Sequence, residues 1–211
     1  KQLFSLLIVF AFGFTQAQTV SSPSGKIALT FTLSSSGQPS YAVNYKAKAV
    51  VLTSDLGIKL KDKPALDGNF EILSTKNSSF NESWKPVLGE QKEIQNNYNQ
   101  LVLELFQKSS KRKMNIVFRL FNEGLAFRYE FPAQENLNYF VISDEVTQFA
   151  LVGDHKAFWI PGDYDSQEYV YNETKLSQVD VSKLDMNNGI GMKGPMANSR
   201  IQSPVMMKSA D

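Results

Sequence analysis

The sequence contains no cysteine and a single histidine, His155, in 211 residues. Without cysteine the chain can form neither a disulfide bond nor a thiolate metal site. A lone histidine also disfavours an imidazole zinc site and a Ser-His-Asp relay. His155 lies among turn residues at 153–156, so we interpret it as a loop histidine and not as a catalyst.

Neither sign of charge is in excess, because 22 lysines and arginines face 21 aspartates and glutamates. The chain therefore has no net field that would steer a polyanion. It also lacks a basic stripe with interleaved aromatic residues, which a nucleic-acid surface would need. We expect no nucleic-acid partner.

An apolar run at residues 6–14 follows the charged Lys1 and is too short to span a bilayer. Small residues at alternate positions, Thr15 and Ala17, suit a signal peptidase. We therefore predict a secretory signal peptide at residues 1–17, cleaved after Ala17. Because Gln18 and not a cysteine would then come first, we expect an exported, periplasmic bacterial protein with no membrane attachment after cleavage.

Helix patterns are nearly absent, with one weak candidate at residues 174–183. The dominant hydrophobic period is two, which is typical of strands. Turn-forming segments at 34–37, 108–113 and 122–124 separate the alternating stretches and predict hairpins. The predicted strands are 27–33, 41–45, 50–52, 57–60, 70–75, 79–84, 101–105, 114–120, 125–131, 139–142 and 149–152. This spacing predicts an all-β domain over residues 18–211, a large antiparallel sandwich.

The two ends of the sequence suggest a piece of a longer protein. No methionine precedes Lys1, and residues 205–208 read as the start of a strand shortly before the chain ends. We expect further chain after residue 211.

The stretch FWIPGDYDSQEY, residues 158–169, is the best candidate for a functional site. Pro161 and Gly162 predict the end of a strand and a reversal, and sites commonly lie on such loops. Carboxylates suit a hard cation, calcium above all, while aromatic rings suit the C–H faces of a sugar. The alternative is a solvated acidic turn with Trp159 in the core. The carboxylates of the stretch are Asp163, Asp165 and Glu168.

Tyr164 and Tyr169 are the better candidates for stacking on a sugar, with Asp165 as a polar partner. Asp163 and Asp165 either cap the turn or support a metal ligand. Trp84 is expected in the core or in interdomain packing and not in a sugar platform.

Four stretches in order resemble the N-terminal domain of glycoside hydrolase family 97, the α-glucosidases and α-galactosidases of Bacteroidetes. The sequence is most similar to members that serve starch utilisation, and the resemblance runs over about residues 20–208. The four stretches are ESWKPVLGE at 82–90, RLFNEGLAFRYEFP at 119–132, LNYFVI at 137–142 and FWIPGDYDSQEY at 158–169.

The resemblance implies a β-super-sandwich of galactose-mutarotase type, followed in the family by a catalytic (β/α)8 barrel and a small β domain. It implies a calcium-dependent, exo-acting α-glycosidase in which the sandwich packs on the barrel and lends one glutamate, here Glu168, to the calcium. The general acid and the base or nucleophile belong to the barrel, so the resemblance places no catalytic residue in this chain. The chain departs from the family pattern at Gln95, where the family has arginine.

Two functions follow as hypotheses. The chain is the carbohydrate-binding, active-site-completing domain of an α-glucosidase or α-galactosidase, inactive alone because the two carboxyls that flank a scissile bond lie elsewhere. Alternatively, it is a stand-alone, non-catalytic carbohydrate-binding sandwich, and a weaker third option is a scaffold for the barrel. The residues leave open the choice between glucose and galactose and between retention and inversion.

Overall fold

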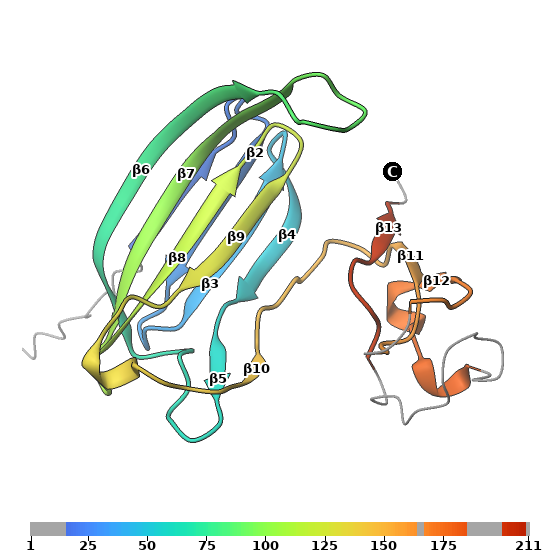
Figure 1. Ribbon diagram of the computed structural model, residues 1–211. Helices are drawn as coiled ribbons and strands as arrows, with labels where there is room; N and C mark the ends of the chain where they lie inside the picture. The colour runs from blue at the N-terminus through green and yellow to red at the C-terminus, as the bar shows by residue number, and fades with distance from the viewer. Residues whose placement is uncertain (1–15, 164–166, 185–199, 210–211) are drawn as a thin grey trace, which may run out of the picture. The chain divides into compact units, whose positions relative to one another are not determined.

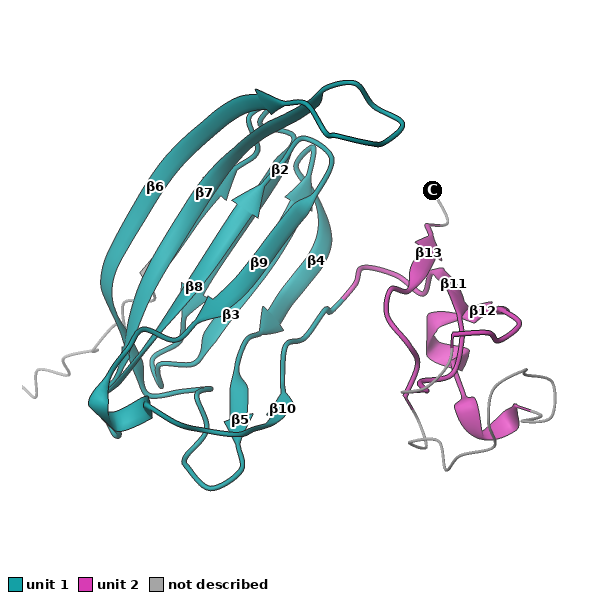
Figure 2. Cartoon of the chain, viewed as in Figure 1, with its two compact units in different colours: residues 1–150 teal, residues 151–211 magenta. Residues whose placement is uncertain are grey.

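The computed structural model of the protein describes residues 16–163, 167–184 and 200–209 (Figure 1). The chain divides into two compact units, residues 1–150 and 151–211 (Figure 2). Strands dominate, and the helices of the described part are three short 3-10 helices: η1 (Glu135–Leu137), η2 (Leu176–Gln178) and η3 (Val181–Lys183). The predicted all-β class is confirmed. The predicted signal peptide lies almost wholly outside the described residues, which begin at Gln16.

No helix within the described ranges is both long enough and apolar enough to cross a membrane.

The first sheet of residues 1–150 is antiparallel and follows the chain order β1-β2-β3-β4. Its strands are β1 (Gln16–Ser21), β2 (Ile27–Leu33), β3 (Pro39–Tyr45) and β4 (Lys48–Asp55). The strand predicted at 27–33 is confirmed, and its alternate residues are buried from Ile27 to Leu33. The turn before β3 needs glycine, because Gly37 has φ +74° and a Cβ there would lie 2.3 Å from the backbone nitrogen of Phe70.

The second sheet has the order β6-β7-β8-β9 and is also antiparallel (Figure 1). Its strands are β6 (Phe70–Trp84), β7 (Ile94–Gln107), β8 (Arg112–Leu120) and β9 (Leu125–Glu130). The prediction of two strands at 70–75 and 79–84 was wrong, because β6 is one strand of 15 residues. Its polar middle, residues 76–78, pairs with residues 100–102 of β7, so tertiary pairing overrides the low strand preference of lysine, asparagine and serine there.

The core lies between these two sheets and contains residues from both: Leu29, Phe31, Tyr41, Val43, Leu101, Leu103, Leu105, Met114, Ile116, Phe118 and Leu120. Phe31 and Phe118 meet across the sheets with ring centroids 6.4 Å apart. Tyr41 is 1% exposed, packs against Phe118 and Phe127, and donates its hydroxyl to the carbonyl of Gln148 at 2.9 Å. Burial raises the pKa of Tyr41 to about 12.

Arg112 is the largest fully buried side chain of the core, at 2% exposure. The hairpin predicted at 108–113 is confirmed, since this segment joins β7 to β8, but Arg112 already belongs to β8 and its side chain is buried. Its Nη2 donates to the Pro64 carbonyl at 2.7 Å and to Gln107 Oε1 at 2.5 Å, and its Nε donates to Ser110 Oγ at 2.6 Å. These acceptors are neutral, and burial lowers the pKa of the guanidinium. Arg112 therefore ties the segment before β6 to the β7–β8 turn.

A short antiparallel pair, β5 (Ile58–Leu60) and β10 (Ile142–Glu145), completes this unit. The strand predicted at 57–60 is confirmed. The strand predicted at 139–142 begins later, at Ile142, and no named strand covers residues 149–152.

Residues 151–211 contain a separate antiparallel sheet with the order β12-β11-β13. Its strands are β11 (Lys156–Trp159), β12 (Asn172–Lys175) and β13 (Met206–Lys208). Its small core contains Ala157, Trp159 and Val181. Trp159 is therefore buried, as expected in the alternative interpretation of residues 158–169 as a solvated acidic turn. The weak helix predicted at 174–183 is replaced by the end of β12 and the two 3-10 helices η2 and η3.

Candidate functional site

The loop that begins after β11 is anchored at its base by the core of residues 151–211. Trp159 is 2% exposed and its indole Nε1 donates to Thr174 Oγ1 at 3.0 Å. Beyond β11, the Gly162 nitrogen donates to the Arg200 carbonyl at 2.9 Å, and a Cβ on Gly162 would lie 3.2 Å from that oxygen. Pro161 forms a bridge with Ile201. The predicted end of a strand at Pro161 and Gly162 is therefore confirmed.

Glu168 is exposed in this loop, beside the half-buried Tyr169. The Tyr169 hydroxyl donates to Asp163 Oδ2 at 2.5 Å, which closes the loop across six residues. Because this carboxylate accepts a hydrogen bond from the protonated phenol and repels the phenolate, it raises the pKa of Tyr169. Asp163 thus orients a tyrosine side chain. Two of the predicted site residues, Tyr164 and Asp165, lie outside the described residues.

The chemistry of this loop suits one contribution to a metal site and not a whole site. The part of the chain that the structure describes has no group of three or more histidine, cysteine, aspartate or glutamate side chains placed to hold a metal. Calcium takes about six to eight oxygen ligands. Glu168 fits that ion as a single carboxylate ligand, provided that the other oxygens come from elsewhere.

His155 directly precedes β11, and its neighbour Asp154 caps the 3-10 helix η2. The Asp154 carboxylate accepts from the Ser177 nitrogen at 2.9 Å and from its hydroxyl at 2.7 Å. These two hydrogen bonds lower the pKa of Asp154. The His155 carbonyl accepts a hydrogen bond from the Leu176 nitrogen at 2.9 Å. The backbone of His155 therefore has a structural role.

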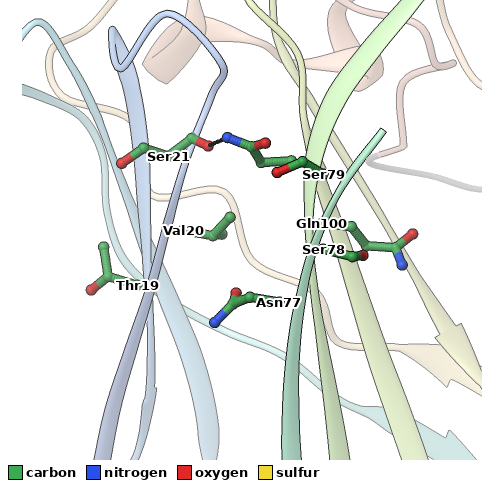
Figure 3. Close-up of a pocket in the computed structure, with 8 residues that line it drawn as sticks. Thr19, Val20, Ser21, Asn77, Ser78, Ser79 and Gln100 are labelled. Atoms are coloured by element: carbon green, nitrogen blue, oxygen red, sulfur yellow. Dashed lines mark hydrogen bonds between the residues drawn. The ribbon is translucent and has the colours of Figure 1, made fainter. Parts of the chain in front are cut away.

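A second candidate surface is a polar cleft of about 500 Å³ between β1 and the β6–β7 pair (Figure 3). Its lining is uncharged: Thr19, Val20, Ser21, Asn77, Ser78, Ser79, Asn99 and Gln100. The Asn99 amide donates to the Ser21 carbonyl at 2.8 Å and joins the two sheets at the mouth of the cleft. Amides and hydroxyls of this kind can exchange hydrogen bonds with water or with a neutral polar ligand, but they carry no charge to balance that of an ion.

Sequence reasoning missed this cleft, because the period of two places only Asn99, and the position of Asn77 depends on the strand register. Leu101 points into the core, so the period of two places Asn99 on the same face, and the pairing of Asn77 with Leu101 places Asn77 there too. The inner face of the sheet therefore changes from apolar to polar between Leu101 and Asn99, toward the start of β7. Trp84, expected in the core or in interdomain packing, is not in the core, because it is 49% exposed at the end of β6.

Comparison with known proteins assigns the domain. The family model described as the N-terminal domain of glycosyl-hydrolase 97 matches residues 20–211. A family 97 enzyme from Pseudoalteromonas sp. strain K8, solved with panose, is 32% identical with a TM-score of 0.72 over 76% of this chain and 25% of that chain. The chain therefore belongs to glycoside hydrolase family 97, of which it is an N-terminal domain.

Two further structures place this assignment in context. A family 97 enzyme from the same strain in complex with acarbose is 32% identical, with a TM-score of 0.70 over 74% of this chain and 24% of that one. A β-arabinopyranosidase is 19% identical with a TM-score of 0.67 over 75% of this chain and 26% of its own, which shows a common fold alone. The chain spans about a quarter of the length of these relatives.

Proposed function

We propose that this chain is the active-site-completing N-terminal domain of an exported, calcium-dependent, exo-acting α-glycosidase, either an α-glucosidase or an α-galactosidase. Membership of family 97 supports a glycoside hydrolase. The solved relatives in complex with panose and acarbose support an oligosaccharide substrate. The signal-like residues 1–17 support export to the periplasm.

The observation that carries the metal part of the proposal is the placement of Glu168. It is exposed on a loop whose start is fixed by buried Trp159 and whose two arms are joined by the hydrogen bond from Tyr169 to Asp163. An exposed carboxylate at this position suits a site shared with another domain.

In the proposed mechanism Glu168 would contribute carboxylate oxygens to calcium, and the catalytic barrel of the same polypeptide would contribute the remaining ligands. Calcium, when bound, would polarise a sugar oxygen or a water molecule. The hydrogen bond between Tyr169 and Asp163 orients the segment that carries Glu168, and buried Trp159 holds the start of the loop in place. The acid and the base or nucleophile belong to the barrel, so residues 18–211 alone should not hydrolyse p-nitrophenyl α-glucoside.

The decisive experiment is calorimetric titration of calcium into the complete enzyme and its Glu168→Gln variant. The amide keeps the size of the side chain and removes the charge, so calcium affinity should fall by about tenfold or more, roughly 1.4 kcal/mol. Glu123→Gln is the matched control, because Glu123 is an exposed glutamate in the β8–β9 turn. Equal calcium affinity in the wild type and the Glu168 variant would retire the assignment.

A further inference from the structure

Phe80 and Trp84 project from the outer face of the β6–β9 sheet. The pairing of Phe80 with Tyr98 places both residues opposite in direction to the buried Leu101, and Trp84 follows Phe80 by two periods of the strand. Phe80 is 41% exposed and Trp84 is 49% exposed. Four residues of extended strand place the backbone positions of Phe80 and Trp84 about 13 Å apart, a span that a trisaccharide can bridge.

The Phe80 ring is held in place by its neighbours. It stacks on Tyr98 with centroids 5.3 Å apart and an interplanar angle of 24°. Tyr98 is braced by Phe121 at 5.2 Å and by the Arg119 guanidinium, 4.6 Å from its ring centroid. The Arg119 Nε donates to Gln100 Oε1 at 2.8 Å, which fixes the guanidinium. A ring supported in this way loses little side-chain entropy when a ligand stacks on it.

Polar groups lie between the two rings. Glu82 is two residues from each ring along β6, and the Asn96 amide donates to Glu82 Oε1 at 3.2 Å. An apolar protein surface docked over both rings would also cover the Glu82 carboxylate, and burial of a charge without full compensation is costly. A sugar chain satisfies both requirements, because its C–H faces stack on aromatic rings while its hydroxyls donate to the carboxylate between them.

We propose that Phe80, Glu82, Trp84 and Asn96 form a binding surface for a neutral oligosaccharide, which we name the outer-face platform. Phe80 and Trp84 provide the two stacking faces, and Glu82 with Asn96 provides the hydrogen bonds between them. This surface goes beyond the proposed function, because it requires neither Glu168 nor calcium.

Tryptophan fluorescence tests the platform directly, because the chain has two tryptophans and Trp159 is 2% exposed. Titration of the chain with maltotriose, a neutral α-linked trisaccharide, should give a saturable blue shift from Trp84. Maltotriose should bind at least about tenfold more tightly than glucose, which can reach one ring only. By calorimetry, Trp84→Ala and Phe80→Ala should each weaken maltotriose binding by about tenfold, and Trp84→Phe should retain most of the affinity while it removes the fluorescence change.

Two controls separate the platform from other surfaces. Tyr139→Ala removes an aromatic residue that lies outside the platform and is 76% exposed. Asn77→Ala alters the polar cleft on the opposite face of β6. Neither variant should change maltotriose binding. Glu168→Gln and removal of calcium should also leave maltotriose affinity unchanged, so the platform and the calcium site fail or succeed separately. The proposal is overturned if maltotriose gives no saturable change, if the Phe80→Ala, Trp84→Ala double variant binds normally, or if Asn77→Ala abolishes binding.

Discussion

Replacement of Arg112 by methionine should destabilise the chain by about 3 kcal/mol. The variant keeps an unbranched side chain of similar length but removes every donor of the guanidinium. The Pro64 carbonyl and Gln107 Oε1 then lose the short hydrogen bonds from Arg112 Nη2. Gln107 Oε1 keeps a hydrogen bond from the Ser110 hydroxyl, so the loss is that of hydrogen bonds from a charged donor, each worth about 1.5–3 kcal/mol. Part of this loss is offset because a charged group no longer has to be desolvated on folding.

Related variants separate hydrogen bonding from volume. Arg112→Lys keeps the charge and some donors but not the planar fork, so it should lose less stability than the methionine variant. Arg112→Ala adds a cavity and should lose more, about 5 kcal/mol. Arg128→Met is the control, because Arg128 forms an exposed pair with Glu130, and such pairs contribute about 0–1 kcal/mol.

Equilibrium unfolding in urea measures these differences, and an unchanged m value would show that the variants unfold between comparable states. A methionine variant within about 0.5 kcal/mol of the wild type, or more stable than it, would refute the reasoning. In that case desolvation of the guanidinium, and not its hydrogen bonds, would dominate the energetics of the site.

Three further predictions concern single side chains. The folded pKa of Tyr41 lies at about 12 against an ordinary 10.0, so stability should be full below pH 10 and fall by about 2 kcal/mol as pH rises to 12. Urea midpoints at pH 9 and 12 should show that Tyr41→Phe lacks this component. Gly37→Ala would place a Cβ 2.3 Å from a backbone nitrogen of β6, so it should cost at least about 3 kcal/mol in urea unfolding. Gly25→Ala is the control, because Gly25 has a similar positive φ but no heavy atom within 4 Å of the added Cβ, and it should cost about 1–2 kcal/mol. Equal losses of stability in the two variants would contradict the steric argument. Tyr169→Phe removes the hydrogen bond to Asp163, and calorimetry of the complete enzyme should show a calcium affinity reduced several-fold but less than by loss of the Glu168 charge; a larger reduction would give Tyr169 the main role.

The regular strands of the sandwich could be predicted from the sequence because burial imposes a period of two on them. This is clearest in β2 and β8, where alternate side chains enter the core. Strand β6 does not show this pattern, because beyond Ile72 it is exposed at the edge of its sheet and its conformation depends on pairing with β7. The burial of Arg112 could not be predicted for a related reason, since its acceptors at residues 64 and 107 come together only in the folded chain.

The candidate sites also combine features that the local sequence predicts with features that depend on the folded chain. The end of β11 shortly before Pro161 could be predicted from local turn chemistry, and the exposure of Glu168 agrees with its expected place on a loop. The hydrogen bond from Tyr169 to Asp163 could not be predicted, because it depends on the path of the loop between them. The two faces of β6 also required the register with β7, which a run of serines and asparagines does not specify.

The length of β6 has a consequence for the behaviour of the protein in solution. Among the described strands it pairs with β7 alone, so one side of a 15-residue strand offers unpaired amides and carbonyls to any extended peptide. Lys76 and Glu82 on this strand, together with the bulge at residues 72–74, discourage such an addition, since charge and irregular pairing both oppose stacking of further chains. These features protect the protein from fibril-like association, so their loss would reduce solubility without any change in the fold.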